Sequence, residues 1–155
     1  LPADPVDRLA HPPGRVVQCD LWFPAPRIAV GFGQEAMLPV LVMVAAFSRF
    51  VAAVMLPSRQ TMDLVAGMWQ LLSQNFTAVP HELWWDNEAG IGRRGRLTEP
   101  VTALVGTLGS RLVQMKPNDP ESKGMVERVN RYLETSFLPG RSFTSPHDFN
   151  DQLGQ

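Results

Sequence analysis

Two aspartates of this 155-residue chain stand in stretches that are otherwise apolar. Asp20 interrupts the β-branched and aromatic run VVQCDLWF, and Asp86 directly follows the run ELWW. Aspartate is disfavoured in β-strands, and a buried carboxylate is costly unless it is paired or binds a metal ion. Taken singly, Asp20 fits an outward-facing strand residue and Asp86 fits a turn or a helix cap. Their joint occurrence with a helical glutamate indicates a carboxylate site for divalent cations.

A segment toward the C-terminal end of the chain offers three candidates for that glutamate, which are Glu121, Glu127 and Glu134. Apolar side chains recur at helical spacing over residues 122–136, and this pattern predicts a helix with one buried face. The apolar positions are Met125, Val126, Val129, Tyr132 and Leu133. The opposite face is expected to carry Lys123, Glu127, Asn130 and Glu134. Periodicity does not separate Glu127 from Glu134, and either can be a solvated surface charge.

Carboxylates in this number suit phosphoryl chemistry. Two hard cations about 3.5–4 Å apart can activate a nucleophile on one side of a phosphorus atom and stabilise the leaving oxygen on the other. Mg²⁺ and Mn²⁺ prefer oxygen ligands and keep several waters, so two or three carboxylates suffice to hold them. We therefore expect two Mg²⁺ or Mn²⁺ ions as cofactors.

The elements that must position these acids follow from hydrophobic spacing. Strands are expected at 16–23, 38–47, 50–56, 82–86 and 111–115, and helices at 61–75, between Thr98 and Gly109, and at 122–136. The order β-β-β-α-β-α-β-α predicts an α/β fold with a five-stranded mixed sheet flanked by helices. Asp86 then ends the fourth strand, at the sheet edge where α/β proteins usually bind ligands.

Local signals give finer expectations. Thr61 and Thr98 are expected to be helix N-caps, and Met62 and Trp69 are expected in the apolar stripe of the first helix. Residues 24–35 are expected to form a loop or a ragged hairpin, and residues 87–96 a loop rich in glycine and arginine.

Composition narrows the class of protein. Hydrophobic residues make up 45% and charged residues 19%, which is typical of a globular domain with a core. No apolar run reaches the roughly 18 residues of a membrane span. The single cysteine, Cys19, excludes an intrachain disulfide and fits a reducing cytoplasm. The chain lacks an initiator methionine, so we expect a fragment of a longer protein in which residues 1–14 form a linker or arm.

The net charge of −1 hides an uneven distribution. Residues 90–141 contain nine Lys and Arg against five acids and carry +4, so the remainder carries −5. A basic segment of this kind can face a polyanion, although such charges can also simply solvate a surface.

Three stretches carry a resemblance to a known family. QCDLW (18–22), WWDNEAG (84–90) and KPNDPESKGMVERVNRYLETSFLPG (116–140) resemble the catalytic core of retroviral-integrase-like DDE transposases. They are most similar to the bacterial insertion-sequence transposases that act with a separate helper ATPase. The resemblance covers about residues 15–141, and residues 142–155 look like the start of a C-terminal extension. In that family the catalytic glutamate lies three residues after the glycine of a Lys-Gly pair, which here implies Glu127.

The resemblance implies a ribonuclease-H-like fold and a role in DNA recombination. The implied reaction is nicking of a transposon 3′ end followed by strand transfer into target DNA. Asp20 would bridge both ions, Asp86 would hold one and Glu127 the other, as an Asp-Asp-Glu triad. The implied DNA-binding residues are Lys123, Asn87, Arg93, Arg94, Arg96 and Arg131. Glu134 lies about two helical turns from Glu127, on the order of 10 Å, too far to share the same ions easily.

Further expectations concern the surroundings of the site. Glu88 could be a spectator or an additional ligand, and the loop 87–97 could contact DNA or simply be mobile. The implied partners are transposon-end and target DNA, a second copy of the chain, and a helper ATPase, in the nucleoid region of a bacterial cytoplasm, with no membrane.

Two alternatives stay open: another ribonuclease-H-like nuclease, which would usually carry a fourth acid, or a degenerate, non-catalytic module for DNA binding or oligomerisation.

Overall fold

The computed structural model describes residues 14–76, 78–115 and 120–154. Its centre is a five-stranded sheet in the order β5-β4-β1-β6-β9. These strands are β1 (Val16–Trp22), β4 (Val40–Ala45), β5 (Val51–Met55), β6 (Glu82–Trp85) and β9 (Arg111–Gln114). β4 pairs antiparallel with both β1 and β5, whereas β1–β6 and β6–β9 are parallel. The expected five-stranded mixed sheet is thereby confirmed.

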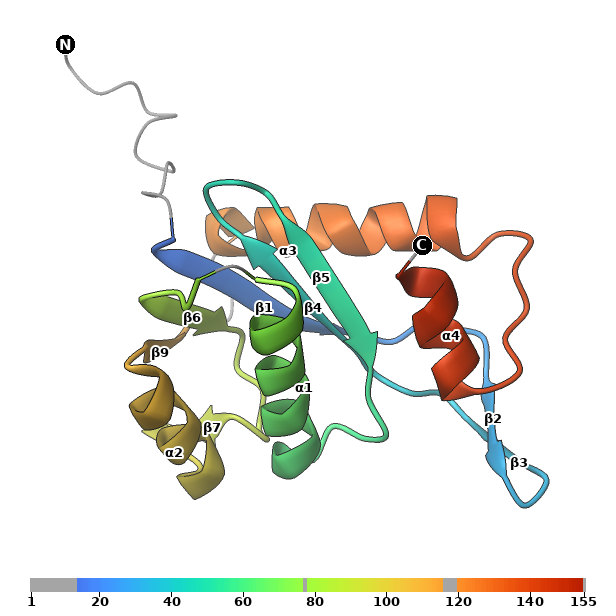
Figure 1. Cartoon of the computed structure of the whole chain (residues 1–155), viewed down its shortest axis with the longest axis horizontal. Coiled ribbons are helices and arrows are strands. Elements are labelled where there is room, and N and C mark those ends of the chain that lie inside the picture. Colours follow the sequence, from blue (N-terminus) through green and yellow to red (C-terminus); the bar gives the residue numbers. More distant parts are fainter. Residues whose placement is uncertain (1–13, 77, 116–119, 155) are drawn as a thin grey trace, which may run out of the picture.

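Helices cover both faces of this sheet (Figure 1). The helices α1 (Thr61–Gln74) and α2 (Glu99–Leu108) pack on one face. On the other lie α3 (Pro120–Tyr132), its continuation as a π-helix (Leu133–Phe137), and α4 (Pro146–Leu153). The backbone N–H of Leu138 donates to the carbonyl of Leu133 at 3.0 Å, which is the π-helical spacing.

The alternation along β1 assigns its side chains to the two faces. Val17, Cys19 and Leu21 lie in the core beneath α1 and α2. Val16 and Trp22 lie in the second core, beneath α3 and α4. Because successive side chains of a strand point to opposite faces, Asp20 points to the same face as these two residues, toward α3.

Two short hairpins lie outside the main sheet. β2 (Ile28–Gly31) pairs with β3 (Gln34–Ala36), so the loop or ragged hairpin expected at 24–35 is a loop followed by a hairpin over residues 28–36. The expected loop at 87–96 is instead partly ordered, because β7 (Gly92–Arg93) pairs with β8 (Arg96–Leu97). Both turn residues have positive φ, 52° at Arg94 and 75° at Gly95, as a two-residue hairpin of this kind requires.

Two expectations about α1 are wrong. Gln60, not Thr61, is the N-cap, and the Thr61 hydroxyl donates to the carbonyl of Gly90 at 2.7 Å. Met62 is 63% exposed and Trp69 50% exposed, so neither belongs to the core. The buried face of α1 runs instead through residues such as Leu64 and Met68. Thr98 is the N-cap of α2 as expected, although its side chain makes no capping hydrogen bond.

The stretch expected to begin a C-terminal extension contributes to the core. Phe149 of α4 is fully buried, with its ring centroid 4.6 Å from that of Phe143 and 5.5 Å from that of Phe137. The domain boundary placed at residue 141 stays a prediction, but α4 packs on the same core face as α3. Among the described residues, no helix combines the length and apolarity needed to cross a bilayer.

Candidate active site

The register of β1 and β6 brings the two aspartates to neighbouring positions. The parallel pairing runs from Val16 opposite Glu82 to Cys19 opposite Trp85. Asp20 and Asp86 are the next residue on each chain segment, with Asp86 just beyond the last residue of β6. The carboxyl ends of parallel strands share one edge of a sheet, so the two acids lie side by side at that edge.

Asp20 is partly buried and is held by hydrogen bonds to both carboxylate oxygens. Its Oδ1 accepts from the backbone N–H of Leu21 at 2.9 Å. Its Oδ2 accepts from Nδ2 of Asn130, on α3, at 3.4 Å. Asn130 therefore belongs to the site, and the sequence-based expectation overlooked it. The available signal was its position three residues after Glu127, on the same stripe of the helix.

The expectation that this stripe faces away from the sheet is wrong for Asn130, whereas Glu134 is exposed as expected and still reaches β1. Asn130 reaches Asp20, and Glu134 accepts a hydrogen bond from the indole Nε1 of Trp22 at 3.0 Å. The reason is that α3 crosses the polar positions of β1, so its polar stripe has partners there. The Glu134 carboxylate is thus bound to Trp22, two residues along β1 from Asp20.

Glu127 lies on α3, one helical turn before Asn130, and is exposed. Within the described residues, no three His, Cys, Asp or Glu side chains form a group that could hold a metal ion. The structure thus brings Asp20 and Asp86 to one edge but does not assemble them with Glu127 into a metal centre. Of the implied DNA-binding residues, Asn87 and Arg131 are exposed, and the side chain of Lys123 lies outside the described part.

The chemistry of the surrounding atoms nevertheless suits a hard cation. In the described part of the chain, Oδ1 of Asn130 and Oε1 of Gln18 are buried acceptors without a hydrogen-bond partner. Gln18 lies two residues before Asp20 and so on the same face of β1. The nearby Cys19 points to the opposite face, and burial, followed by the charge of Asp20, raises the pKa of its thiol. An oxygen-only donor set of this kind fits Mg²⁺ or Mn²⁺.

The turn after Asp86 is held by hydrogen bonds of its own. Oδ1 of Asp86 accepts from the N–H of Asn87 at 2.8 Å, and the carbonyl of Asp86 accepts from the N–H of Glu88 at 2.7 Å. The Glu88 carboxylate is bound by both Nε and Nη2 of Arg59, at 3.2 and 2.9 Å. The Glu88 carboxylate thus binds an arginine in this structure, and the two expectations for Glu88, spectator or ligand, both stay predictions.

Gly90 anchors this turn to the start of α1, and its lack of a side chain is a steric requirement. A Cβ at Gly90 would lie 2.7 Å from Cδ1 of Leu64 and 2.9 Å from the carbonyl oxygen of Arg59. We expect Gly90→Ala to lower the free energy of unfolding by about 1–3 kcal/mol, the usual cost of overpacking. Urea unfolding checks this, with Gly106→Ala as control. A Cβ at Gly106 meets nothing within 4 Å, so that helical substitution should stabilise by about 0.5–1 kcal/mol. Equal effects of the two substitutions would contradict the steric argument.

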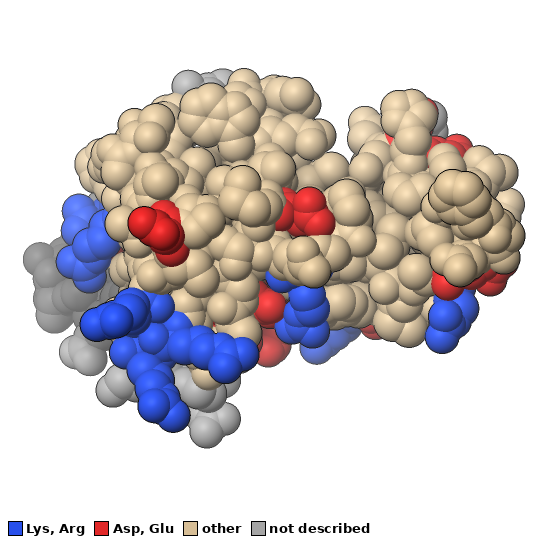
Figure 2. Space-filling model, turned by 90° about the horizontal axis from the view of Figure 1, so that it is seen from below, with Lys and Arg blue, Asp and Glu red and all other residues tan. Residues whose placement is uncertain are grey.

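Basic side chains lie on the β7–β8 hairpin. Arg93, Arg94 and Arg96 are all exposed. The hairpin is tied to β9, because Nε2 of Gln114 donates to the carbonyl of Gly92 at 3.1 Å. Figure 2 shows a dense group of Lys and Arg side chains at one end of the molecule, with Asp and Glu side chains beside it. A basic surface of this kind can attract an extended anion.

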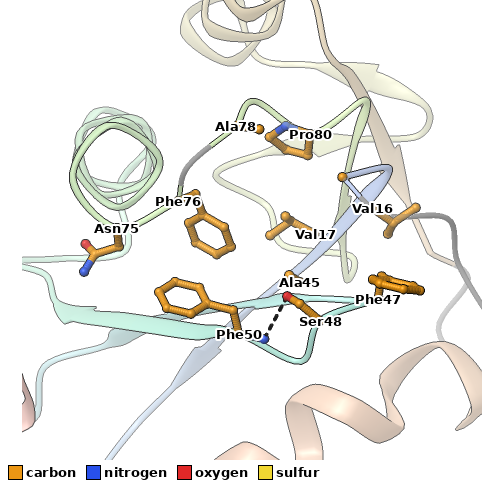
Figure 3. A pocket seen from close by; sticks show the side chains of 11 residues that line it. Val16, Val17, Ala45, Phe47, Ser48, Phe50, Asn75, Phe76, Ala78 and Pro80 are labelled. Atoms are coloured by element: carbon orange, nitrogen blue, oxygen red, sulfur yellow. Dashed lines mark hydrogen bonds between the residues drawn. The ribbon is translucent and has the colours of Figure 1, made fainter.

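An apolar pocket of about 560 Å³ lies at the other end of β1 (Figure 3). It is lined by Val16 and Val17 and by three phenylalanines, Phe47, Phe50 and Phe76. The rings of Phe50 and Phe76 meet edge to face at 5.2 Å between centroids. None of the described residues that line this pocket is an acid or a base.

Comparisons with known proteins bear on the fold. No protein-family model and no curated protein matches the sequence. One similar chain belongs to the cryo-EM structure of the simian T-cell lymphotropic virus intasome in complex with PP2A regulatory subunit B56 gamma. Its TM-score is 0.66 at 17% identity, and the match covers 98% of this chain but only 55% of that one. The catalytic core domain of BIV integrase matches with a TM-score of 0.59 at 17% identity, over 91% of this chain and 96% of that one. The chain therefore has the ribonuclease-H-like α/β fold of an integrase catalytic core.

Proposed function

We propose that this chain is the catalytic core of a DDE transposase that nicks DNA 3′ ends and joins them to target DNA. The observation that carries the proposal is the placement of Asp20 and Asp86 at one edge of parallel strands, facing the helix that bears Glu127. Support comes from the integrase-core fold and from the sequence motifs around the three acids. The subgroup that acts with a helper ATPase is proposed from the motifs alone.

In this proposal Asp20, Asp86 and Glu127 hold two Mg²⁺ or Mn²⁺ ions. When bound, such ions activate the attacking oxygen and stabilise the leaving oxygen of a phosphodiester. The protein's own contribution is orientation. The N–H of Leu21 and the amide of Asn130 each hold one oxygen of Asp20, and the N–H of Asn87 holds Oδ1 of Asp86. These bonds fix the carboxylates before any substrate arrives, as good ligand positioning requires.

The basic hairpin is proposed to hold DNA, together with Asn87, Lys123 and Arg131. Replacing Arg93, Arg94 and Arg96 with Gln should weaken binding of duplex DNA and lower the slope of log K against log salt by about 2.7, because each lost phosphate contact removes about 0.9. Fluorescence anisotropy over a salt series measures this slope. Arg27→Gln is the control, since Arg27 is exposed next to the separate β2–β3 hairpin. An unchanged slope in the triple variant would remove the hairpin from the DNA interface.

The wider assignments are part of the same proposal. The partners would be transposon-end and target DNA, a second copy of the chain, and a helper ATPase, in the nucleoid region of a bacterial cytoplasm. The match covers only 55% of the intasome chain, so the activity and partners of a whole protein belong to the proposal.

The test is metal-dependent nicking and strand transfer with end-labelled DNA. Products should form with Mn²⁺ or Mg²⁺ and disappear when EDTA removes the metal. The carboxylates alone supply no Lewis acid to activate the nucleophile or stabilise the leaving oxygen. The assay is run on this chain and on the longer protein that we expect to contain it. Products that persist in EDTA would contradict the metal-dependent reaction. Binding of DNA without any product in either protein would favour a non-catalytic module instead.

A further inference from the structure

Arg59 lies where it can join the two strand ends that carry the aspartates. It stands just before α1, outside the sheet and outside every motif that points to the site. Its guanidinium binds the Glu88 carboxylate through two parallel hydrogen bonds, at 2.9 and 3.2 Å. The same guanidinium lies over the ring of Phe23, with 5.0 Å between Cζ and the ring centroid. Glu88 follows Asp86 by two residues, and Phe23 follows Asp20 by three.

The Glu88 side chain depends on this partner. It is only 12% exposed, whereas the Arg59 side chain is 59% exposed. A carboxylate so far removed from water needs a charged or hydrogen-bonding partner, and a two-pronged arginine contact is among the strongest available. The hydrogen bond to Glu88, followed by the charge of that carboxylate, raises the pKa of Arg59.

The backbone of Glu88 extends this contact to Asp86. Its N–H donates to the carbonyl of Asp86 at 2.7 Å, and its own carbonyl accepts from the N–H groups of Ile91 and Gly92, at 3.0 and 3.2 Å. A guanidinium that holds the Glu88 side chain therefore restrains the whole turn that begins at Asp86. The contact with Phe23 relates this turn to the end of β1.

We infer that Arg59 is a positioning residue, which fixes the Asp86 turn against the end of the strand that carries Asp20. The effect of Arg59 on catalysis rests on the proposed function. Its effect on the position of the Asp86 turn does not. Arg59 touches no substrate in this account. It acts through Glu88 and Phe23, and its loss should loosen Asp86 without unfolding the sheet.

Amide hydrogen exchange tests the effect on the Asp86 turn in the absence of metal and DNA. In Arg59→Ala the amides of Glu88, Ile91 and Gly92 should exchange about tenfold faster, because the restrained turn opens more often. The amide of Leu56, which donates to the carbonyl of Pro39 at 2.8 Å, should be unchanged. Unchanged exchange at all three turn amides would overturn the inference.

Charge reversal separates positioning from a general structural role. Glu88→Arg alone should behave like Arg59→Ala, and Arg59→Glu combined with Glu88→Arg should restore most of the protection. Arg59→Lys, which keeps the charge but loses the two-pronged geometry, should fall between wild type and Arg59→Ala. Failure of the swapped pair to restore protection, with its melting temperature unchanged, would also count against the inference.

The effect of Arg59 on catalysis is measured as the Mn²⁺ concentration that gives the half-maximal rate of nicking. Arg59→Ala should need several times more Mn²⁺ for the half-maximal rate. Loss of a residue that touches a metal ligand directly typically costs about 10–100-fold in metal affinity or activity, and Arg59 acts less directly, through a turn. Asp20→Asn serves as the reference. If that variant keeps full activity, the proposed function has failed. If it is inactive while Arg59→Ala matches wild type in Mn²⁺ dependence, only the inference about Arg59 has failed.

Discussion

Asp20→Asn should lower nicking and strand transfer by more than about 100-fold, beyond the range typical of residues that only support a metal ligand. It should also remove the stabilisation that Mn²⁺ gives to the wild-type chain. Asparagine keeps the shape of the side chain and can still accept from the N–H of Leu21. The loss therefore reflects one missing negative charge at a cation site and not a disturbed strand.

The expected rise in the free energy of unfolding follows from the mass action of Mn²⁺ binding to the folded chain. At a tenfold excess of free Mn²⁺ over its dissociation constant, one site adds about 1.4 kcal/mol to the free energy of unfolding. For a domain of this size that corresponds to a rise in melting temperature of about 3–6 °C. Thermal melting with and without millimolar Mn²⁺ measures it, with Glu35→Gln as control, because Glu35 is exposed on β3. An equal rise in wild type and Asp20→Asn would place the metal elsewhere.

Phe149→Ala should lower the free energy of unfolding by about 3–5 kcal/mol, the usual cost of deleting a large aromatic side chain from a core. Phe149 is fully buried and lies near three aromatic rings, those of Trp22, Phe137 and Phe143. Trp22 is the residue whose indole also binds Glu134, so α4 supports the same part of β1 as the π-helix does. Such a loss would make α4 a structural part of the core.

Urea denaturation measures this effect, and the chain provides a matched control. Phe32 is fully exposed at the tip of the β2–β3 hairpin, so Phe32→Ala should change stability by less than about 0.5 kcal/mol. If Phe149→Ala were as mild as Phe32→Ala, α4 would not be part of the folded core. The residues after 141 would then be the separate extension that the sequence suggested.

The sheet could be predicted from sequence because its strands leave a local signal. β4 is almost continuously apolar, and it lies between β1 and β5 with both faces covered. The positions of Asp20 and Asp86 could be anticipated for a similar reason, since an acid within or directly after an apolar strand is conspicuous. The β7–β8 hairpin was missed because each strand has only two residues, too few for a periodic pattern.

The partners of the acids could not be predicted, because they depend on contacts between distant segments. Asn130 and Asp20 are separated by 110 residues, and Arg59 and Glu88 by 29. Helical periodicity placed Asn130 and Glu134 on the outer face of the predicted helix, since it assumes that polar residues seek water. In the structure Asn130 of α3 binds Asp20, and Glu134 of the π-helix binds the indole of Trp22. The exposure of Met62 and Trp69 has the same origin, because only the docking of α1 decides which part of its apolar stripe is buried.

We propose that Glu127 completes a metal site with Asp20 and Asp86. The most direct measurement compares Glu127→Gln with Glu134→Gln for Mn²⁺-dependent strand transfer on end-labelled DNA. Glutamine at 134 can still accept from the indole of Trp22, so this variant should retain activity near that of wild type. Glu127→Gln should lose at least about 100-fold, with its melting temperature unchanged. Full activity in Glu127→Gln, or an equal loss in both variants, would contradict the account.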